Sequence, residues 1–278
     1  MSTGTTTTSP PGDDVAPHGS TGSRATRILG VLTLVGSALV VWLAFIATPA
    51  DRVQGESVRL LYLHVPSVTV AYLACGITFV ASAMWLWKRS EWWDIVGSSA
   101  AEIASVFTAV TLLTGMVWGQ ATWGTAWEWD PRLTSTLFLF LLLVGYQALR
   151  AAAPDRDARA RRSAVVGLLL IPNIVVVNRS VEWWRSLHQD ATLFRTDLDF
   201  RIEGLMLFTW MFATVVGLVL LAWLLIHRFR VGWLANRAEE RRLDDAVAAR
   251  RAEGGVPPVV DLAPTAAPTT GSGTGGDA

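Results

Sequence analysis

The sequence predicts an all-α membrane protein with six transmembrane helices and with both ends of the chain in the cytoplasm. Three observations lead to this fold class. Of the 278 residues, 51% are hydrophobic and 17% are charged, whereas soluble domains carry roughly 25% charged residues. The hydrophobic residues gather in six runs, and most arginines lie between alternate pairs of those runs.

The six apolar runs are the expected membrane spans. Crossing the hydrocarbon core as a helix takes about 20 residues, within a range of about 17 to 25. Four runs reach that length easily, and the fifth is short and holds Pro172 and Asn173. A short or broken helix is tolerated where protein covers its backbone, so all six are expected to span. The runs are residues 27–48, 61–87, 97–118, 133–149, 163–178 and 204–226.

The two ends of the chain have the composition of disordered tails. Residues 1–25 are rich in Thr, Ser, Gly and Pro and lack the basic start and short apolar core of a cleavable signal peptide. Residues 236–278 are first charged, with a stretch that also suits a helix, and then rich in Pro and Gly. We therefore expect one functional domain, residues 26–235, between two tails.

The arginines set the expected orientation, because cytoplasmic segments of membrane proteins carry an excess of Lys and Arg. With the N-terminus inside, sixteen of the 23 basic residues fall in cytoplasmic segments. Three loops then face outward, at residues 49–60, 119–132 and 179–203. The third outer loop is an exception, because it contains several arginines although it faces outward. These arginines either bind an anionic ligand or pair with nearby aspartates. These residues are Arg179, Arg185, Arg195, Arg201, Asp190, Asp197 and Asp199.

Two residues that occur once each exclude several kinds of chemistry. The only lysine, Lys88, follows Trp87, so the chain holds no GxxxxGK[ST] phosphate-binding loop. Any ATP-driven step would need another subunit. The only cysteine, Cys75, lies in an apolar run, which excludes a CxxC redox pair, a CxxCH haem-attachment site and an internal disulfide.

The second outer loop is unusually rich in tryptophan. Tryptophans gather at membrane interfaces for general reasons. Their density here, beside two glycines that allow close backbone approach, instead predicts a flat apolar surface for a planar ligand. Trp123 and Trp127 would share one face of any helical turn. The stretch WGQATWGTAWEWDP contains Trp118, Gly119, Trp123, Gly124, Trp127 and Trp129.

Asp130 and Pro131 end this loop and predict the start of the fourth span. Aspartate is a preferred helix N-cap, and proline suits the first helical position. This structural role does not exclude a second one, in which Asp130 holds the Trp loop as part of a site.

Two of the four histidines share the outer side with the Trp loop. His64 lies at the outer end of the second span in LYLHVPS, and His188 lies in the third outer loop in SVEWWRSLHQD. Each alone is also explained as a hydrogen-bonded interfacial imidazole. Together they match the needs of haem, whose iron takes axial nitrogen ligands while its ring needs apolar contact. A zinc site would want three or four ligands at set spacing.

The residues around the histidines add detail to this prediction. Trp184 and His188 are four apart, which predicts a short amphipathic helix that aims His188 along the aromatic surface. Pro66 lies two residues after His64, so the second span either starts near residue 65 or is kinked there. Three arginines close in sequence to these motifs are candidates for binding the haem propionates. They are Arg59, Arg132 and Arg185.

These motifs resemble those of a known family. WGQATWGTAWEWDPRLTS resembles the WWD signature of haem-handling proteins in c-type cytochrome maturation, and specifically that of the haem exporter protein C family, CcmC. LYLHVPS at 61–67 and SVEWWRSLHQDAT at 180–192 resemble the two histidine-bearing outer segments of that family. The six expected spans match its topology. The resemblance covers residues 26–235.

The resemblance implies a role in haem delivery rather than in catalysis. A CcmC-like protein of the bacterial cytoplasmic (inner) membrane would bind haem b at the outer face through His64 and His188, with the Trp loop as the binding surface. It would present the haem to the chaperone CcmE. It would associate with the ABC ATPase CcmA, the membrane subunit CcmB and the small subunit CcmD, and no nucleic acid is among its implied partners.

Three other functions remain open from the residues alone. The chain could be a permease that moves haem or another hydrophobic solute through its own helices, a haem-containing oxidoreductase, or a structural subunit without a ligand. Glu102 in the third span is the one charge that would favour a permease, although its position also suits a side chain that reaches the inner face. An oxidoreductase would place its histidines inside the spans. Haem bound to the purified protein would exclude the structural subunit.

Overall fold

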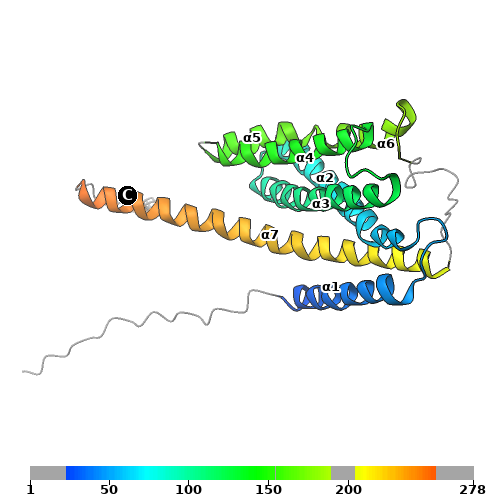
Figure 1. The fold of residues 1–278 in the computed structure, drawn as a ribbon. Helices are drawn as coiled ribbons and strands as arrows, with labels where there is room; N and C mark the ends of the chain where they lie inside the picture. Colours follow the sequence, from blue (N-terminus) through cyan, green and yellow to red (C-terminus); the bar gives the residue numbers. More distant parts are fainter. Residues whose placement is uncertain (1–22, 154, 189–203, 255–278) are drawn as a thin grey trace, which may run out of the picture. The chain divides into compact units, whose positions relative to one another are not determined.

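The computed structural model describes residues 23–153, 155–188 and 204–254. These residues form helices joined by short loops (Figure 1). The described residues up to Gly232 form one compact unit, and those from Trp233 belong to a second. The elements are α1 (Arg24–Trp42), a π-helical turn η1 (Leu43–Ala47), a 3-10 turn η2 (Glu56–Leu60), α2 (Leu61–Lys88), α3 (Glu91–Trp123), α4 (Pro131–Ala151), α5 (Arg156–Gly167), α6 (Leu170–Trp183) and α7 (Gly204–Glu253).

Within the described residues, six segments are long and apolar enough to cross a membrane, which confirms the predicted all-α fold with six spans. The protein is therefore a multi-pass membrane protein. Most spans extend beyond the predicted apolar runs, because polar residues at the ends of a helix continue its backbone hydrogen bonding. The spanning segments are Arg24–Ala47, Glu56–Lys88, Glu91–Trp123, Pro131–Ala151, Arg156–Trp183 and Gly204–Glu253.

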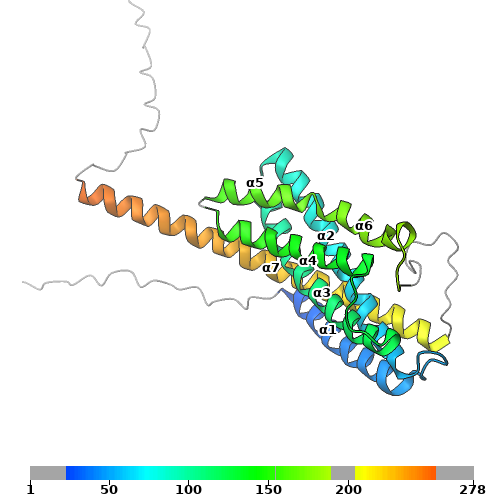
Figure 2. The same ribbon diagram turned by 45° about the horizontal axis from the view of Figure 1, so that its top comes forward.

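The fifth span is built from two helices, α5 and α6, which follow each other end to end (Figure 2). They meet at Leu168 and Leu169. Pro172 is the third residue of α6, where the backbone N–H of a helix has no internal acceptor. The proline therefore stands in the first turn of a helix instead of breaking one.

The second span begins earlier than the position near residue 65 that Pro66 suggests. Turn η2 leads directly into α2, which starts at Leu61, so His64 lies in the first turn of the helix. Pro66 is inside the helix and buried. It packs against α7, where a Cβ built on Gly217 would lie 3.8 Å from the Cβ of Pro66. Tertiary packing thus keeps a proline in a position that local propensity disfavours.

Small residues let the central helices approach closely. The core between α2 and α3 is built on Ala74, Cys75, Ala101 and Ala104, all of which are fully buried. At the end of α5, a Cβ built on Gly167 would overlap the Oγ atom of Ser82 in α2 and lie 3.0 Å from its Cβ atom. A side chain at this position would force Ser82 or the helix to shift.

We expect Gly167→Ala to destabilise the protein by about 1 to 3 kcal/mol, because the added methyl group overpacks the contact between α5 and α2. Thermal unfolding of the detergent-solubilised protein measures the effect. Gly145→Ala in α4 is the matched control, since a Cβ there meets nothing within 4 Å. Equal melting temperatures for the two variants would contradict the tight contact.

The loops after α1, α3 and α6 lie at one end of the helices, together with the start of α7 (Figure 1). Hydrogen bonds join them: the Trp118 indole donates to the Gln54 side chain at 2.9 Å, and the hydroxyls of Thr48 and Thr209 are 3.0 Å apart. At the opposite end, Arg150 of α4 pairs with Asp94 of α3. Successive spans therefore run in opposite directions, and the predicted outer loops meet.

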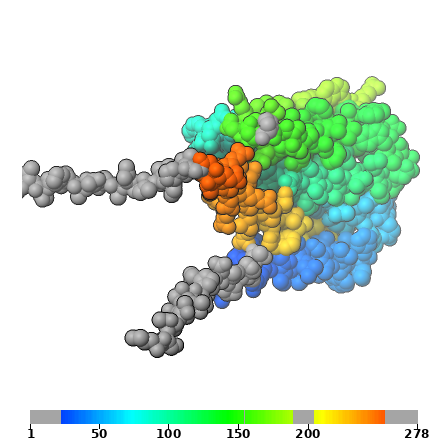
Figure 3. All heavy atoms as spheres, turned by 90° about the vertical axis from the view of Figure 1, so that its left-hand side faces the viewer, coloured from blue at the N-terminus to red at the C-terminus, as the bar shows by residue number. Residues whose placement is uncertain are grey.

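Helix α1 packs along α7 (Figure 3). Two glycines of α1 permit this, because a Cβ on Gly30 would lie 3.1 Å from the Trp223 ring and one on Gly36 would lie 2.8 Å from Val216. The helix ends in the π-helical turn η1. Arg59 donates hydrogen bonds to two carbonyl oxygens at this end of the first span, those of Ala44 and Thr48.

In the second unit, residues Trp233–Glu253 continue α7, so the charged stretch is helical up to Glu253. The Arg237 guanidinium lies 4.7 Å from the Trp233 ring centre. Residues 1–22 and 255–278 of the predicted tails lie outside the described residues. The division into one domain and two tails stays a prediction.

Candidate functional site

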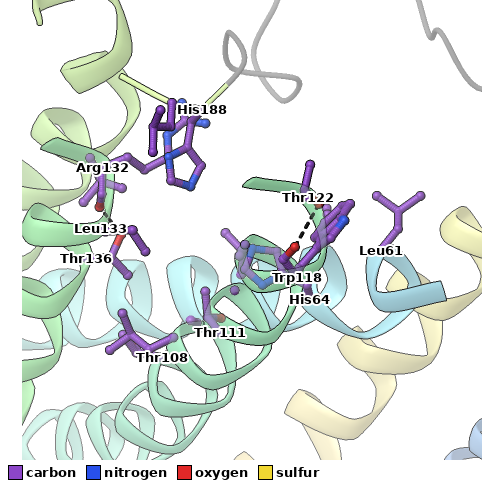
Figure 4. Close-up of a pocket in the computed structure, with 18 of the residues that line it drawn as sticks. Leu61, His64, Thr108, Thr111, Trp118, Thr122, Arg132, Leu133, Thr136 and His188 are labelled. Atoms are coloured by element: carbon purple, nitrogen blue, oxygen red, sulfur yellow. Dashed lines mark hydrogen bonds between the residues drawn. The ribbon is translucent and has the colours of Figure 1, made fainter. Parts of the chain in front are cut away.

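A cavity of about 440 Å³ lies at the end where the predicted outer loops meet. Side chains from α2, α3, α4, α6 and α7 line it, together with residues of the loops after α1 and α6. Figure 4 shows that His64 and His188 point into this space from different sides. The lining includes His64, Trp118, Trp123, Arg132, His188 and Trp210.

His64 is held by the neighbouring helix α3. Its Nδ1 atom is 2.9 Å from the Oγ1 atom of Thr114. The imidazole lies edge-on to the Trp118 ring, with ring centres 5.7 Å apart. A Cβ on Gly115 would lie 3.1 Å from the Cε1 atom of His64. The ring therefore lies directly against the backbone of α3.

His188 is held by Asp130. Its Nδ1 atom is 3.0 Å from the Oδ1 atom of Asp130, and its ring lies edge-on to Trp123 with centres 4.6 Å apart. Burial lowers the pKa of His188 below its ordinary value and nearby Arg132 lowers it further, although the Asp130 carboxylate partly opposes both effects. A neutral imidazole has one N–H. Since Nδ1–H donates to Asp130, the Nε2 atom keeps its lone pair for a ligand.

Asp130 joins the start of α4 to the loop after α6. Its Oδ1 atom accepts the backbone N–H groups of Arg132 and Leu133 at 2.9 and 3.4 Å, which confirms the predicted N-cap of α4. Its Oδ2 atom accepts the Ser186 hydroxyl at 2.6 Å and the Leu187 N–H at 2.8 Å. Burial alone would raise the pKa of Asp130, but these hydrogen bonds and nearby His188 hold it below its ordinary value.

The predicted amphipathic helix around His188 is wrong. Helix α6 ends at Trp183, and Trp184 has an extended backbone with φ −132° and ψ 160°. The physical reason is the Asp130 carboxylate, which binds Ser186 and the Leu187 N–H and so holds this segment as a loop over α4. His188 is aimed into the cavity by that loop.

The four tryptophans of the second outer loop fall into two groups. Trp118 and Trp123 lie on α3 and line the cavity. Trp127 and Trp129 do not line it; they pack edge-on at 5.5 Å, and Trp129 is 75% exposed. The predicted shared face of Trp123 and Trp127 is wrong, because α3 ends at Trp123 and Gly124 turns the chain with a φ of +77°.

Gly119 allows the close approach that the sequence predicts. A Cβ there would lie 3.2 Å from the Thr125 carbonyl oxygen and 3.2 Å from the Trp123 ring. The glycine thus lets the loop fold back onto the end of α3 beneath Trp123.

The three candidate arginines occupy different surroundings. Arg132 lines the cavity near His188. Arg59 does not line it, and instead binds Glu56 at 2.5 Å and the carbonyl oxygens at the end of α1. Arg185 is exposed and outside the lining, as is Trp184. The other predicted residues of the third loop, Asp190, Arg195, Asp197, Asp199 and Arg201, lie outside the described residues.

Several residues of the site were not found by the sequence reasoning. Trp210 of α7, Tyr72 of α2 and Gln54 in the first loop all line the cavity. Thr114 binds His64 from α3. None of them belongs to a motif, and only the packing of separate helices brings them to the site.

Comparison with known proteins assigns this chain to a family. Residues 18–244 match the family described as heme exporter protein C. The chain belongs to the haem exporter protein C family. It is 38% identical over 201 residues to heme exporter protein C of Bradyrhizobium diazoefficiens, covering 69% of this chain and 73% of that protein. It is 34% identical over 212 residues to heme exporter protein C of Haemophilus influenzae, covering 75% and 83%.

The residues that line the cavity of this haem exporter C family member have the chemistry that haem requires. Indole rings offer apolar contact, the imidazoles offer nitrogen ligands, and the Arg132 guanidinium offers a carboxylate partner. Both histidines, the Trp loop and Asp130 lie within the matched residues 18–244.

Proposed function

We propose that this protein binds haem b in the cavity, with His64 and His188 as axial ligands, and delivers it to the chaperone CcmE for c-type cytochrome maturation. The observation that carries the proposal is the pair of imidazoles that line one aromatic cavity, each with its Nδ1 atom hydrogen-bonded to a neighbouring side chain. Each Nε2 atom is then the nitrogen that meets the iron.

The surrounding residues have complementary roles in this proposal. Trp118 and Trp123 cover the porphyrin with apolar surface, and Arg132 binds a propionate. Asp130 fixes His188 and the loop that carries it. Haem is the cargo of the site, so these contacts orient it for release rather than enclose it.

The cavity is expected to open on the outer face of the cytoplasmic membrane. The excess of arginine in the segments assigned to the cytoplasm supports this orientation. Three tryptophans close in sequence to Asp130 or His188 are exposed, namely Trp129, Trp183 and Trp184. Indoles at a membrane interface also suit protein contact, so we assign this group to the docking of CcmE. The ATP-driven step belongs to CcmA, with CcmB and CcmD as the other subunits.

The alternative of a permease receives less support. Glu102, the charge that would favour it, forms an ion pair with Arg228 of α7. It does not line the cavity. A role in joining α3 to α7 accounts for this side chain.

The test is the haem content of histidine variants. We expect His64→Ala and His188→Ala to bind haem more than about tenfold more weakly. Loss of a residue that only hydrogen-bonds to a metal ligand already lowers metal affinity about 10- to 100-fold, and loss of the ligand itself should lower it at least as much. Optical spectra of the purified proteins measure this. His227→Ala is the matched control, since His227 packs on Trp223 of its own helix and lies outside the cavity lining. Normal haem absorbance in both site variants would refute the proposal.

A further inference from the structure

The hydroxyl group of Thr114 contacts both its own helix and the imidazole of His64. Its Oγ1 atom is 2.7 Å from the Val110 carbonyl oxygen and 3.2 Å from the Thr111 carbonyl oxygen. A hydroxyl has a single proton. Two oxygen atoms 2.7 Å apart need a proton between them, and this contact is shorter than the 2.9 Å contact with the Nδ1 atom of His64. We therefore assign the Thr114 proton to the Val110 carbonyl, which leaves the Thr114 oxygen as an acceptor.

That oxygen lies 2.9 Å from the Nδ1 atom of His64. Since Thr114 accepts here, Nδ1 must donate, and the neutral ring is the Nδ1–H tautomer. Its Nε2 atom then carries the lone pair. Which nitrogen of a histidine binds a metal is set by the hydrogen bond that the other nitrogen makes.

Gly115, the next residue of α3, provides the space for this arrangement. A Cβ at this position would lie 3.1 Å from Cε1 and 3.7 Å from Nδ1 of His64. A methyl group there would push the imidazole away from α3 and so lengthen its hydrogen bond to Thr114. The Thr114 hydroxyl and the Gly115 backbone thus contact the same edge of the His64 imidazole, at Nδ1 and Cε1.

We infer that Thr114 and Gly115 are positioning residues for the haem ligand His64. The threonine hydroxyl stabilises the Nδ1–H tautomer, whose Nε2 atom is free to bind iron, and the glycine leaves space for the imidazole against α3. This inference rests on the proposed function. His188 obtains the same tautomer from a carboxylate, Asp130. The two ligands thus depend on separate hydrogen-bond partners, and substitutions of Thr114 and Gly115 act on His64 rather than on His188.

The first experiment reads the tautomer without haem. The chain has four histidines, so ¹⁵N-histidine labelling gives few signals, and single histidine substitutions assign them. We expect His64 to be the Nδ1–H form in the haem-free protein and to move toward the Nε2–H form in Thr114→Val. Thr114→Ser, which keeps the hydroxyl, should restore Nδ1–H. An Nε2–H signal in the unsubstituted protein, or no change in Thr114→Val, would overturn the inference.

The second experiment measures haem affinity by optical titration of the same proteins. We expect Thr114→Val and Gly115→Ala to bind haem about 10- to 100-fold more weakly. Thr33→Val controls for loss of a hydroxyl bonded to its own helix, and Gly76→Ala controls for a methyl group in α2 that meets nothing within 4 Å. Both controls should bind haem as the unsubstituted protein does.

The outcomes separate the two proposals. If the unsubstituted protein bound no haem, the proposed function would fail, and the role of the tautomer in ligation would fail with it. If haem binding needed His64 but was unaffected by Thr114→Val and Gly115→Ala, the function would stand and the inference would be wrong.

Discussion

Replacing Asp130 with alanine is expected to destabilise the protein by about 3 to 5 kcal/mol and to weaken haem binding by more than about tenfold. Loss of an N-cap costs about 0.5 to 2 kcal/mol, and each hydrogen bond to a buried charge contributes about 1.5 to 3 kcal/mol. Asp130 caps α4 and also binds Ser186, the Leu187 N–H and His188. Its removal frees the whole segment that carries His188.

Thermal unfolding and haem titration of detergent-solubilised Asp130→Ala measure the two effects. Asp155→Ala is the matched control, because Asp155 caps α5 through a 2.8 Å hydrogen bond from the Ala158 N–H at the other end of the bundle. We expect that control to lose about 1 kcal/mol and no haem affinity. A loss of stability in Asp130→Ala no larger than in Asp155→Ala would show that Asp130 is only a cap.

The same side chain makes the site sensitive to acid. The pKa of Asp130 lies below its ordinary value of 3.8 in the folded protein. Its contribution to stability is therefore complete above about pH 3.8 and is lost as the pH falls through the lowered pKa. Asp130→Asn should remove this part of the acid dependence.

Replacing Arg150 with leucine is expected to destabilise the fold by about 3 to 5 kcal/mol, because it leaves the Asp94 carboxylate buried without its partner. The guanidinium binds both carboxylate oxygens of Asp94, at 2.5 and 3.0 Å, and the Ser163 hydroxyl at 3.1 Å. The two side chains are only 13% and 10% exposed. Three helices, α3, α4 and α5, meet at this pair.

The double variant Arg150→Leu/Asp94→Leu should recover most of the lost stability, since apolar residues often replace a buried ion pair at little cost. Arg179→Leu is the control. It removes an ion pair with Glu182 whose side chains are 57% and 48% exposed, and such pairs contribute about 0 to 1 kcal/mol. Equal unfolding temperatures for Arg150→Leu and Arg179→Leu would contradict the prediction. Haem binding should survive in all three variants, because the pair lies at the end of the helices away from the cavity.

The features that the sequence predicted correctly depend on local signals. Six apolar runs of sufficient length predict six spans whatever their packing. Asp130 before Pro131 predicts a helix start from the two residues alone. The two histidines share the cavity because alternate loops of a helical membrane protein meet at the same end.

Of the features that the sequence analysis missed, one is a local helix end and the others depend on contacts between segments. Trp123 and Trp127 have helical spacing, but Gly124 ends α3 between them. The segment after Trp183 has the pattern of an amphipathic helix, but the Asp130 carboxylate holds it as a loop. Thr114 is one of many threonines, and only the register of α3 against α2 places its hydroxyl beside His64.

Helix α1 supplies no side chain to the wall of the cavity. Its end is tied to the rest of the unit by Thr48 and Arg59, and the turn that follows carries Gln54, which binds the Trp118 indole. Movement of α1 along its neighbour would therefore reach the Trp118 ring in the cavity wall through a single short turn. The position of the first span thus controls the position of one indole of a wall to which the span itself does not belong.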